Sequence, residues 1–196
     1  MTQIKNGNRG AGLRRHRQLL IVIAALVLTA GSTSFIYGQD SVKLDKEVDA
    51  AIAKLYAGSP IAKQLGKTAK AILIFPKVKK AGFLIGGQYG EGALLKGGTA
   101  VAYYKTTGAS FGLQAGGQTY GYAMFFMNAK ALDDFVNASG FEVGVGPSVV
   151  LVDEGMAKTT TTATLKDDIY AFVFGQKGLM AGLGIQGNKI TKITPK

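Results

Sequence analysis

Glycine recurs in strand-like runs from residue 82 onward, and this recurrence constrains the fold more than any other feature of the chain. The chain has 28 glycines in 196 residues, without the every-third-residue spacing of collagen. The runs are GFLIGGQYGEG, GASFGLQAGGQTYG, GFEVGVG and GQKGLMAGLGIQG. Glycine inside a strand costs stability, so its repeated use indicates strong coiling, bulges or the close approach of another backbone or ligand. We therefore expect a strongly curved sheet that resembles half a barrel.

The apolar pattern after Ala71 has the period of two that is typical of strands. AILIFP (71–76) is an apolar run of strand length, and we expect Pro76 to close it. In residues 109–119, an apolar side (Phe111, Leu113, Ala115) alternates with a polar side (Ser110, Gln114, Gln118). Further short runs occur at 82–95, 99–105, 120–127, 141–152, 169–174 and 179–186, and Gly187-Asn188 suits a hairpin into KITKI. These runs predict a large antiparallel sheet.

Two helices are expected before this sheet. The first lies within 40–58, where Val48, Ile52, Leu55 and Tyr56 recur at helical spacing. The second has Ser59 as its N-cap, Pro60 at its first position and an end near Lys70. On a helical wheel its apolar side carries Ile61, Leu65, Thr68 and Ile72, and its opposite side carries Lys63, Lys67 and Lys70.

A third helix is expected inside the sheet region. Asn128 suits an N-cap, and AKALDDFVN places Leu132, Phe135 and Val136 on one side. The predicted fold class is therefore α+β, with helices at the N-terminus followed by a curved, glycine-rich antiparallel sheet and one inserted helix.

The first 38 residues have the pattern of a secretory signal peptide. Basic residues precede the apolar run LLIVIAALVLTA (19–30), and small residues follow it. We expect cleavage between Gly31 and Gln39, which leaves residues 39–196 as an exported domain, periplasmic or secreted and peripheral to a membrane. The alternative is an uncleaved anchor, because the apolar stretch extends through 35–37.

The composition argues against an enzyme. The chain has no Cys, and its one histidine, His16, lies in the predicted leader, so the mature chain lacks a Ser-His or Cys-His nucleophile. GLGIQG (182–187) has no following helix to hold a pyrophosphate, and Gly66-Lys67-Thr68 lacks the first glycine of a P-loop. Neighbouring acids at 133–134, 153–154 and 167–168 do not face each other as a catalytic pair. We expect no catalytic residue, no metal and no cofactor.

Lysine is concentrated in one segment that has no acidic residue. Residues 50–90 hold seven lysines and no Asp or Glu: Lys54, Lys63, Lys67, Lys70, Lys77, Lys79 and Lys80. Such a run is also compatible with a merely solvated helix face. However, cations without interspersed acids attract anionic membrane surfaces. Nucleic acid is disfavoured as the partner, because export would separate the protein from the nucleic acid of the cell. In addition, the mature chain has no Arg or Trp for base readout and stacking.

The segment AILIFPKVKKAGFLIGGQYGEGALL (71–95) resembles the signature of the SYLF family, and the resemblance continues through 108–127, 131–155 and 169–187. Members of this family bind phosphoinositides and other anionic lipids, and eukaryotic members also bind or bundle actin. The resemblance implies lipid binding here, with Lys77, Lys79 and Lys80 in the matching PKVKKAGF stretch. KGGTAVAYYKTTGASFG replaces the Trp-Ser-x-Pro segment of eukaryotic members, which implies an exported, bacterial-type member.

The sequence therefore predicts a non-enzymatic domain that binds anionic lipid headgroups. The expected binding residues are Lys63, Lys67, Lys70, Lys77, Lys79 and Lys80, with shallow hydrophobic contact from the helix around 48–56 or from a glycine-rich strand. One alternative is a protein-interaction or structural module of the cell envelope that uses a sheet edge. Another is a small outer-membrane barrel, although several of the expected strands are too short for it.

Overall fold

A computed structural model of the chain describes residues 33–143, 149–152, 166–178 and 187–195. The chain divides into two compact units, one of residues 1–41 with Lys196 and the other of residues 42–195. Most of the predicted signal peptide lies outside the described residues. None of the helices in the described ranges has the length and apolar character needed to cross a bilayer. Apart from residues 33–41 of helix α2, the features below belong to the unit of residues 42–195.

The predicted N-terminal helices are present, with shifted ends. Helix α2 (Thr33–Gly58) begins before Asp40, and α3 (Pro60–Thr68) follows it directly. Ser59 caps α3 as expected, because its Oγ accepts a hydrogen bond from the Ala62 N–H at 3.3 Å. Helix α3 ends at Thr68 rather than near Lys70, so Ile72 belongs to the following strand and not to the helix.

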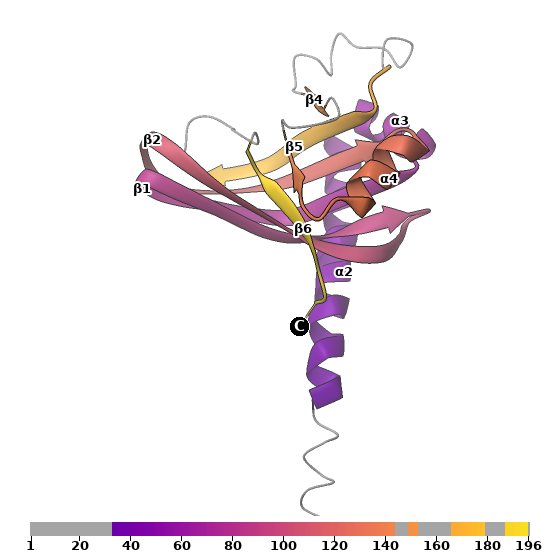
Figure 1. Cartoon of the computed structure of the whole chain (residues 1–196), viewed down its shortest axis with the longest axis horizontal. Helices are drawn as coiled ribbons and strands as arrows, with labels where there is room; N and C mark the ends of the chain where they lie inside the picture. Colours follow the sequence, from indigo (N-terminus) through magenta and orange to yellow (C-terminus); the bar gives the residue numbers. More distant parts are fainter. Residues whose placement is uncertain (1–32, 144–148, 153–165, 179–186, 196) are drawn as a thin grey trace, which may run out of the picture. The chain divides into compact units, whose positions relative to one another are not determined.

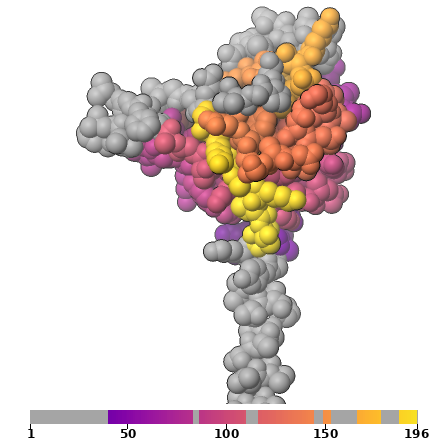
Figure 2. All heavy atoms as spheres, viewed as in Figure 1, coloured from indigo at the N-terminus to yellow at the C-terminus, as the bar shows by residue number. Residues whose placement is uncertain are grey.

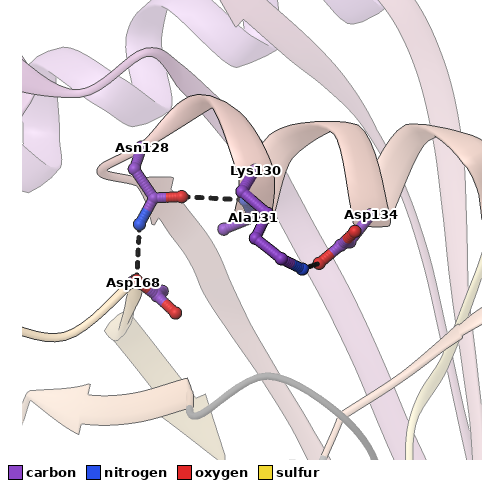
Figure 3. Close-up of polar contacts among 5 residues, drawn as sticks. All are labelled: Asn128, Lys130, Ala131, Asp134 and Asp168. Carbon is purple, nitrogen blue, oxygen red and sulfur yellow. Dashed lines mark hydrogen bonds and ion pairs between the residues drawn. The ribbon is translucent and has the colours of Figure 1, made fainter.

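Helix α4 (Ala129–Asn137) is fixed at its N-terminus by Asn128 (Figure 3). The Asn128 Oδ1 accepts a hydrogen bond from the Ala131 N–H at 2.8 Å, and its Nδ2 donates to Asp168, which precedes strand β5. Leu132 and Phe135 are buried as predicted, but Val136 is 38% exposed. The prediction for Val136 was wrong because it lies one position beyond Phe135, about 100° further around the helix.

The expected short strands from 71 to 127 are merged into two long ones. Strand β1 (Ala71–Lys96) and β2 (Thr99–Phe126) form an antiparallel hairpin, with Gly97 and Gly98 at positive φ in its turn (Figure 1). Contrary to our prediction, Pro76 does not close the first strand. Instead, β1 continues past it through a register shift between Phe75 and Val78. A bulge tolerates proline because the unpaired residue needs no ladder hydrogen bond.

Within the described residues, four shorter strands join the sheet around this hairpin. They are β3 (Phe141–Glu142), β4 (Val149–Val152), β5 (Ile169–Gly178) and β6 (Lys189–Ile193). The strand order is β3-β6-β2-β5-β4, and β1 pairs with β2. The β4–β5 pair is parallel, so the sheet is mixed rather than wholly antiparallel. Strand β6 follows Gly187 as predicted, but its partners are β2 and β3; the other side of the expected hairpin, 179–186, lies outside the described residues.

Glycine allows the β1–β2 hairpin to curl until two parts of β1 touch. A Cβ at Gly92 would lie 2.1 Å from the Ile74 carbonyl oxygen, and one at Gly90 would lie 2.9 Å from the Val78 Cγ2. No larger residue fits such an approach without moving the backbone. The expected α+β fold with a strongly curved, half-barrel sheet is therefore confirmed, and close backbone approach is the reason for these two glycines.

Each face of the curved sheet has its own hydrophobic core. The face that packs against α4, here called the inner face, carries Leu73, Phe75, Val78, Tyr104, Tyr122 and Met124. The face that packs against α3 and residues 42–58 of α2, here called the outer face, carries Ile72, Ile74, Ala93, Leu95 and Phe125. In the space-filling view the orange atoms of α4 lie beside the yellow atoms of β6 (Figure 2). The two sets alternate along the strands, as the pleat requires.

Candidate functional site

The exposed lysines of the acid-free segment lie on the outer-face side of the sheet. Lys63 and Lys67 are exposed on α3, and Lys70 is exposed at the junction with β1. Lys77 and Lys79 are exposed on β1, on either side of Val78, whose side chain is buried in the inner core. Because successive strand residues point to opposite faces, both lysines project from the outer face. Five of the six predicted binding residues are therefore exposed on one side of the sheet.

Among the described residues, these lysines have no acidic partner. No Asp or Glu occurs between residues 50 and 90. Within the described parts of the chain, the single ion pair is Lys130–Asp134, at 2.6 Å on α4. The exposed lysines of α3 and β1 are like charges on one side of the sheet, an arrangement that favours anions.

Two further lysines lie near these exposed lysines. Lys54 belongs to the acid-free segment, whereas the sequence interpretation missed Lys177. Thr119 on β2 pairs with Lys79 on one side and with Lys177 of β5 on the other, so two exposed lysines flank it across three strands. A Cβ at Gly175 of β5 would lie 2.7 Å from the Lys54 Nζ, so the Lys54 side chain reaches the same strand. Lys177 is distant from the lysine segment in sequence, and only the β2–β5 pairing brings it close.

Lys80 does not belong with the exposed lysines, contrary to our expectation. It is 4% exposed and pairs across the ladder with Gln118, which is 5% exposed. Gln118 was expected on the polar side of its strand. Both side chains lie on the inner face, because Lys80 is two residues from Val78 and Gln118 is two residues from Tyr120. The other residues of the predicted alternation, 110–115, have side chains outside the description.

Lys80 and Gln118 belong to a set of polar residues on the inner face, here called the inner polar cluster. Its members are Lys80, Gln88, Tyr104, Thr106, Gln118, Tyr120, Tyr122 and Asn188. The Tyr120 hydroxyl donates to the Gln88 Oε1 at 2.7 Å, and the Gln88 Nε2 donates to the Asn188 Oδ1. Four buried atoms make no hydrogen bond: the hydroxyl oxygens of Tyr104, Thr106 and Tyr122, and the Oε1 of Gln118.

Burial controls the protonation of the tyrosines in this cluster. It raises the pKa of Tyr120 to about 12. It also raises the pKa of Tyr122, to which the neighbouring Tyr120 contributes, and that of Tyr104. All three hydroxyls are therefore neutral donors at physiological pH. Lys80 is the one basic residue of the inner polar cluster.

The motifs considered for catalysis have other roles where they are described. Gly66 lies against the Tyr56 ring, since a Cβ there would be 2.1 Å from the Tyr56 hydroxyl; this segment is helix and not a phosphate loop. Asp134 pairs with Lys130, and Asp168 accepts from Asn128. GLGIQG and the acids at 153–154 lie largely or wholly outside the described residues. The described residues contain no group of three or more His, Cys, Asp or Glu placed to hold a metal.

A family model covers the second part of the chain. The Ysc84 model, described as "Las17-binding protein actin regulator", matches residues 107–194. These residues include most of β2, all of α4 and the strands β3 to β6. The match begins after the lysine segment, so it includes Gln118, Tyr120, Tyr122 and Asn188 but not Lys63 to Lys80. No match was found among curated proteins.

Proposed function

Because residues 107–194 match the model of the Ysc84, or SYLF, family, we propose that this protein is a non-enzymatic binding domain whose outer-face lysines attract anionic lipid headgroups. The observation that carries the proposal is the exposure on one side of the sheet of five lysines that form no ion pair within the described part of the chain: Lys63, Lys67, Lys70, Lys77 and Lys79. Lys177 extends this surface across β2 onto β5. Phosphoinositides and other anionic phospholipids are the ligand class that we infer.

The binding that we propose is mainly electrostatic. A lysine near an anionic membrane surface contributes about 1 kcal/mol of attraction, so several lysines together give useful affinity that falls as salt rises. The shallow insertion expected of the helix around 48–56 is not part of the mechanism. Val48 and Leu55 are 1% and 3% exposed in the outer-face core, and so are unavailable to a membrane. If residues 1–38 direct export, this surface meets the phospholipids of the cell envelope.

Vesicle co-sedimentation of the 196-residue chain tests the proposal. We expect stronger binding to vesicles of phosphatidylcholine with phosphatidylglycerol than to phosphatidylcholine alone, because only the former carry net negative charge. The triple variant Lys63→Glu, Lys67→Glu, Lys70→Glu should lose at least about tenfold of the anionic binding, since each reversal replaces attraction by repulsion. Equal binding to both kinds of vesicle would contradict the proposal.

A matched variant separates this surface from net charge alone. Lys96, Lys166 and Lys192 are exposed lysines outside the proposed surface. Their replacement by Glu changes the net charge by the same amount as the α3 triple variant. We expect the matched variant to retain most of the binding. An equal loss in both triple variants would show that the lipid responds to overall charge and not to this surface.

The family description favours a protein partner as a second candidate. It names Las17 binding and actin regulation, so a related protein-binding role is the alternative for this chain. Co-sedimentation with actin filaments in the absence of lipid tests it directly. Binding to filaments that survives the α3 charge reversals, together with no preference for anionic vesicles, would favour the protein-binding alternative over the lipid one.

A further inference from the structure

We propose that the inner polar cluster is a second binding site, which takes one anionic oxygen group, a phosphate or a carboxylate, between the two parts of the curled β1–β2 hairpin. This site is distinct from the lysine surface, because it lies on the opposite face of the sheet. The proposal does not depend on the outer face binding lipid.

The charge of the inferred ligand follows from Lys80. The residue as a whole is 4% exposed and forms no ion pair within the described residues, but its Nζ is not one of the fully buried atoms that lack a hydrogen bond. A lysine that buries its aliphatic stem and keeps its ammonium at the edge of a polar cluster can meet an anion at that point. The ladder partner of Lys80 is the neutral Gln118, and no other cluster member is acidic. An anion supplied from outside the chain would provide the missing partner.

The polar character of the ligand follows from the unpaired oxygens. More than nine in ten buried polar groups in proteins have a hydrogen-bond partner, yet four buried oxygens of this cluster have none. Three of them are hydroxyls, which can donate to the oxygens of an anion, as the Lys80 ammonium can. The Gln118 Oε1 accepts only, so it suits a hydroxyl or a protonated oxygen of the same ligand. Ordered water could satisfy these oxygens but would not neutralise the lysine.

The fold brings these groups together from positions that are far apart in the sequence. Lys80 and Gln118 are cross-strand neighbours, and Tyr120 continues the same row of β2. The hydrogen bonds from Tyr120 to Gln88 and from Gln88 to Asn188 then join both parts of β1 to the start of β6. Gly108 leaves room for this contact, since a Cβ there would lie 2.4 Å from the Asn188 Oδ1. Thr106 and Tyr104 follow on the same face of β2.

Binding of soluble probes to the purified 196-residue chain tests the site. The probes are inorganic phosphate, hexanoate and a short-chain phosphatidic acid below its micelle concentration, with hexanol as the neutral control. Isothermal titration calorimetry should detect at least one anionic probe and not hexanol. Phosphate binding alone would identify a free anion as the ligand, whereas binding only of the short-chain lipid would identify a headgroup. Failure of all three anions to bind would overturn the proposal.

Lys80→Met separates a binding role from a structural one. Methionine keeps much of the length of the side chain but removes its charge. We expect the affinity for the anionic probe to fall at least about tenfold, as for loss of a charge-assisted hydrogen bond. The unfolding temperature without ligand should stay about the same, because Lys80 has no ion pair within the described residues to lose. Unchanged affinity, or a fall in ligand-free stability with unchanged affinity, would overturn the proposal.

The lysine-surface variant is the control for independence of the two sites. Lys63→Glu, Lys67→Glu, Lys70→Glu should bind the soluble probe as the parent chain does, while Lys80→Met should keep its preference for anionic vesicles. Loss of probe binding in the α3 variant would contradict a separate inner site. If the α3 variant loses its preference for anionic vesicles but still binds the soluble probe, the result supports two separate sites.

Discussion

Lysine residues are exposed on one face of the curved sheet and buried on the other. On the outer face, Lys77 and Lys79 are exposed and form no ion pair within the described residues, and Lys63 and Lys67 of α3 are exposed on the same side of the sheet. On the inner face, Lys80 is buried among neutral polar groups. One residue of separation along β1 is enough for this difference, because strand neighbours point to opposite faces. Exposed lysines suit a broad, salt-sensitive contact, whereas a buried lysine suits one defined anionic group.

The inner face depends on the curl of the hairpin, and Gly92→Ala should break it. The added methyl carbon would lie 2.1 Å from the Ile74 carbonyl oxygen, and Ile74 is held in the ladder opposite Ala123. We expect the free energy of unfolding to fall by about 3 kcal/mol, as for severe overpacking. Chemical denaturation measures this change. Gly58→Ala is the control, since nothing lies within 4 Å of its added Cβ, and it should change stability by less than about 1 kcal/mol. Equal effects would contradict a tightly closed hairpin.

Features with a local cause were the ones that the sequence predicted correctly. The caps at Ser59 and Asn128 depend on residues three positions away, and both are present. The helix ends were less accurate, because the transition from α3 to β1 is set by the sheet, where the Lys70 N–H donates to the Phe126 carbonyl. Pro76 was wrongly interpreted as a strand end. The bulge that accommodates it arises in the pairing of β1 with β2, which the local sequence does not show.

The candidate sites show the same division. The exposed lysines of α3 and β1 could be found from one stretch of sequence that lacks acids. Lys177 could not, because its relation to Lys79 passes through Thr119 on a third strand. The inner polar cluster was hidden for a further reason. The alternation around Gln118 correctly separates two faces, but it does not show that the polar face is enclosed when the hairpin curls. Glutamine and lysine in a strand are normally exposed, so the pattern favoured solvent.

High pH should weaken the inner face through Tyr120. Burial raises the pKa of Tyr120 from 10.0 to about 12, so the folded state holds a proton that the unfolded state releases near pH 10. The contribution to stability is complete below pH 10 and is lost as the pH rises towards 12. A shift of this size corresponds to about 2 to 3 kcal/mol.

Urea denaturation of the parent chain and of Tyr120→Phe at pH 8, 10 and 11 measures this contribution. The stability of the parent chain should fall more steeply above pH 10 than that of the variant, which lacks the titrating hydroxyl. Other pH-dependent groups are the same in both proteins, so the comparison cancels their contribution. Parallel curves would show that Tyr120 is not protected from ionisation by the fold.

Binding of anionic vesicles at the outer face should also depend on Lys177, which lies outside the lysine segment. Lys79→Glu, Lys177→Glu reverses the two charges that flank Thr119. At about 1 kcal/mol for each lysine, we expect the affinity for anionic vesicles to fall about tenfold or more, with a smaller salt dependence. Lys96→Glu, Lys192→Glu is the matched control at other exposed positions. If the control loses as much affinity, the surface is not extended onto β5.

The smallest expected effect compares two tyrosines of the inner polar cluster. The Tyr122 hydroxyl is buried without a partner, so Tyr122→Phe should stabilise the ligand-free protein by about 1 kcal/mol, because a desolvated polar group is removed. The Tyr120 hydroxyl donates to Gln88 at 2.7 Å, so Tyr120→Phe should destabilise it by about the same amount. Thermal unfolding at pH 7 measures both.

The same two variants also test what the unpaired hydroxyl does. A bound anion would use the Tyr122 hydroxyl as a donor, so Tyr122→Phe should lose several-fold affinity for the anionic probe while it gains ligand-free stability. This opposite movement of affinity and stability is typical of binding groups, because a site kept ready for a ligand holds polar atoms that the empty protein does not satisfy. If Tyr122→Phe lowers stability instead, the hydroxyl already has a partner such as ordered water, and the inner face is polar for structural reasons alone.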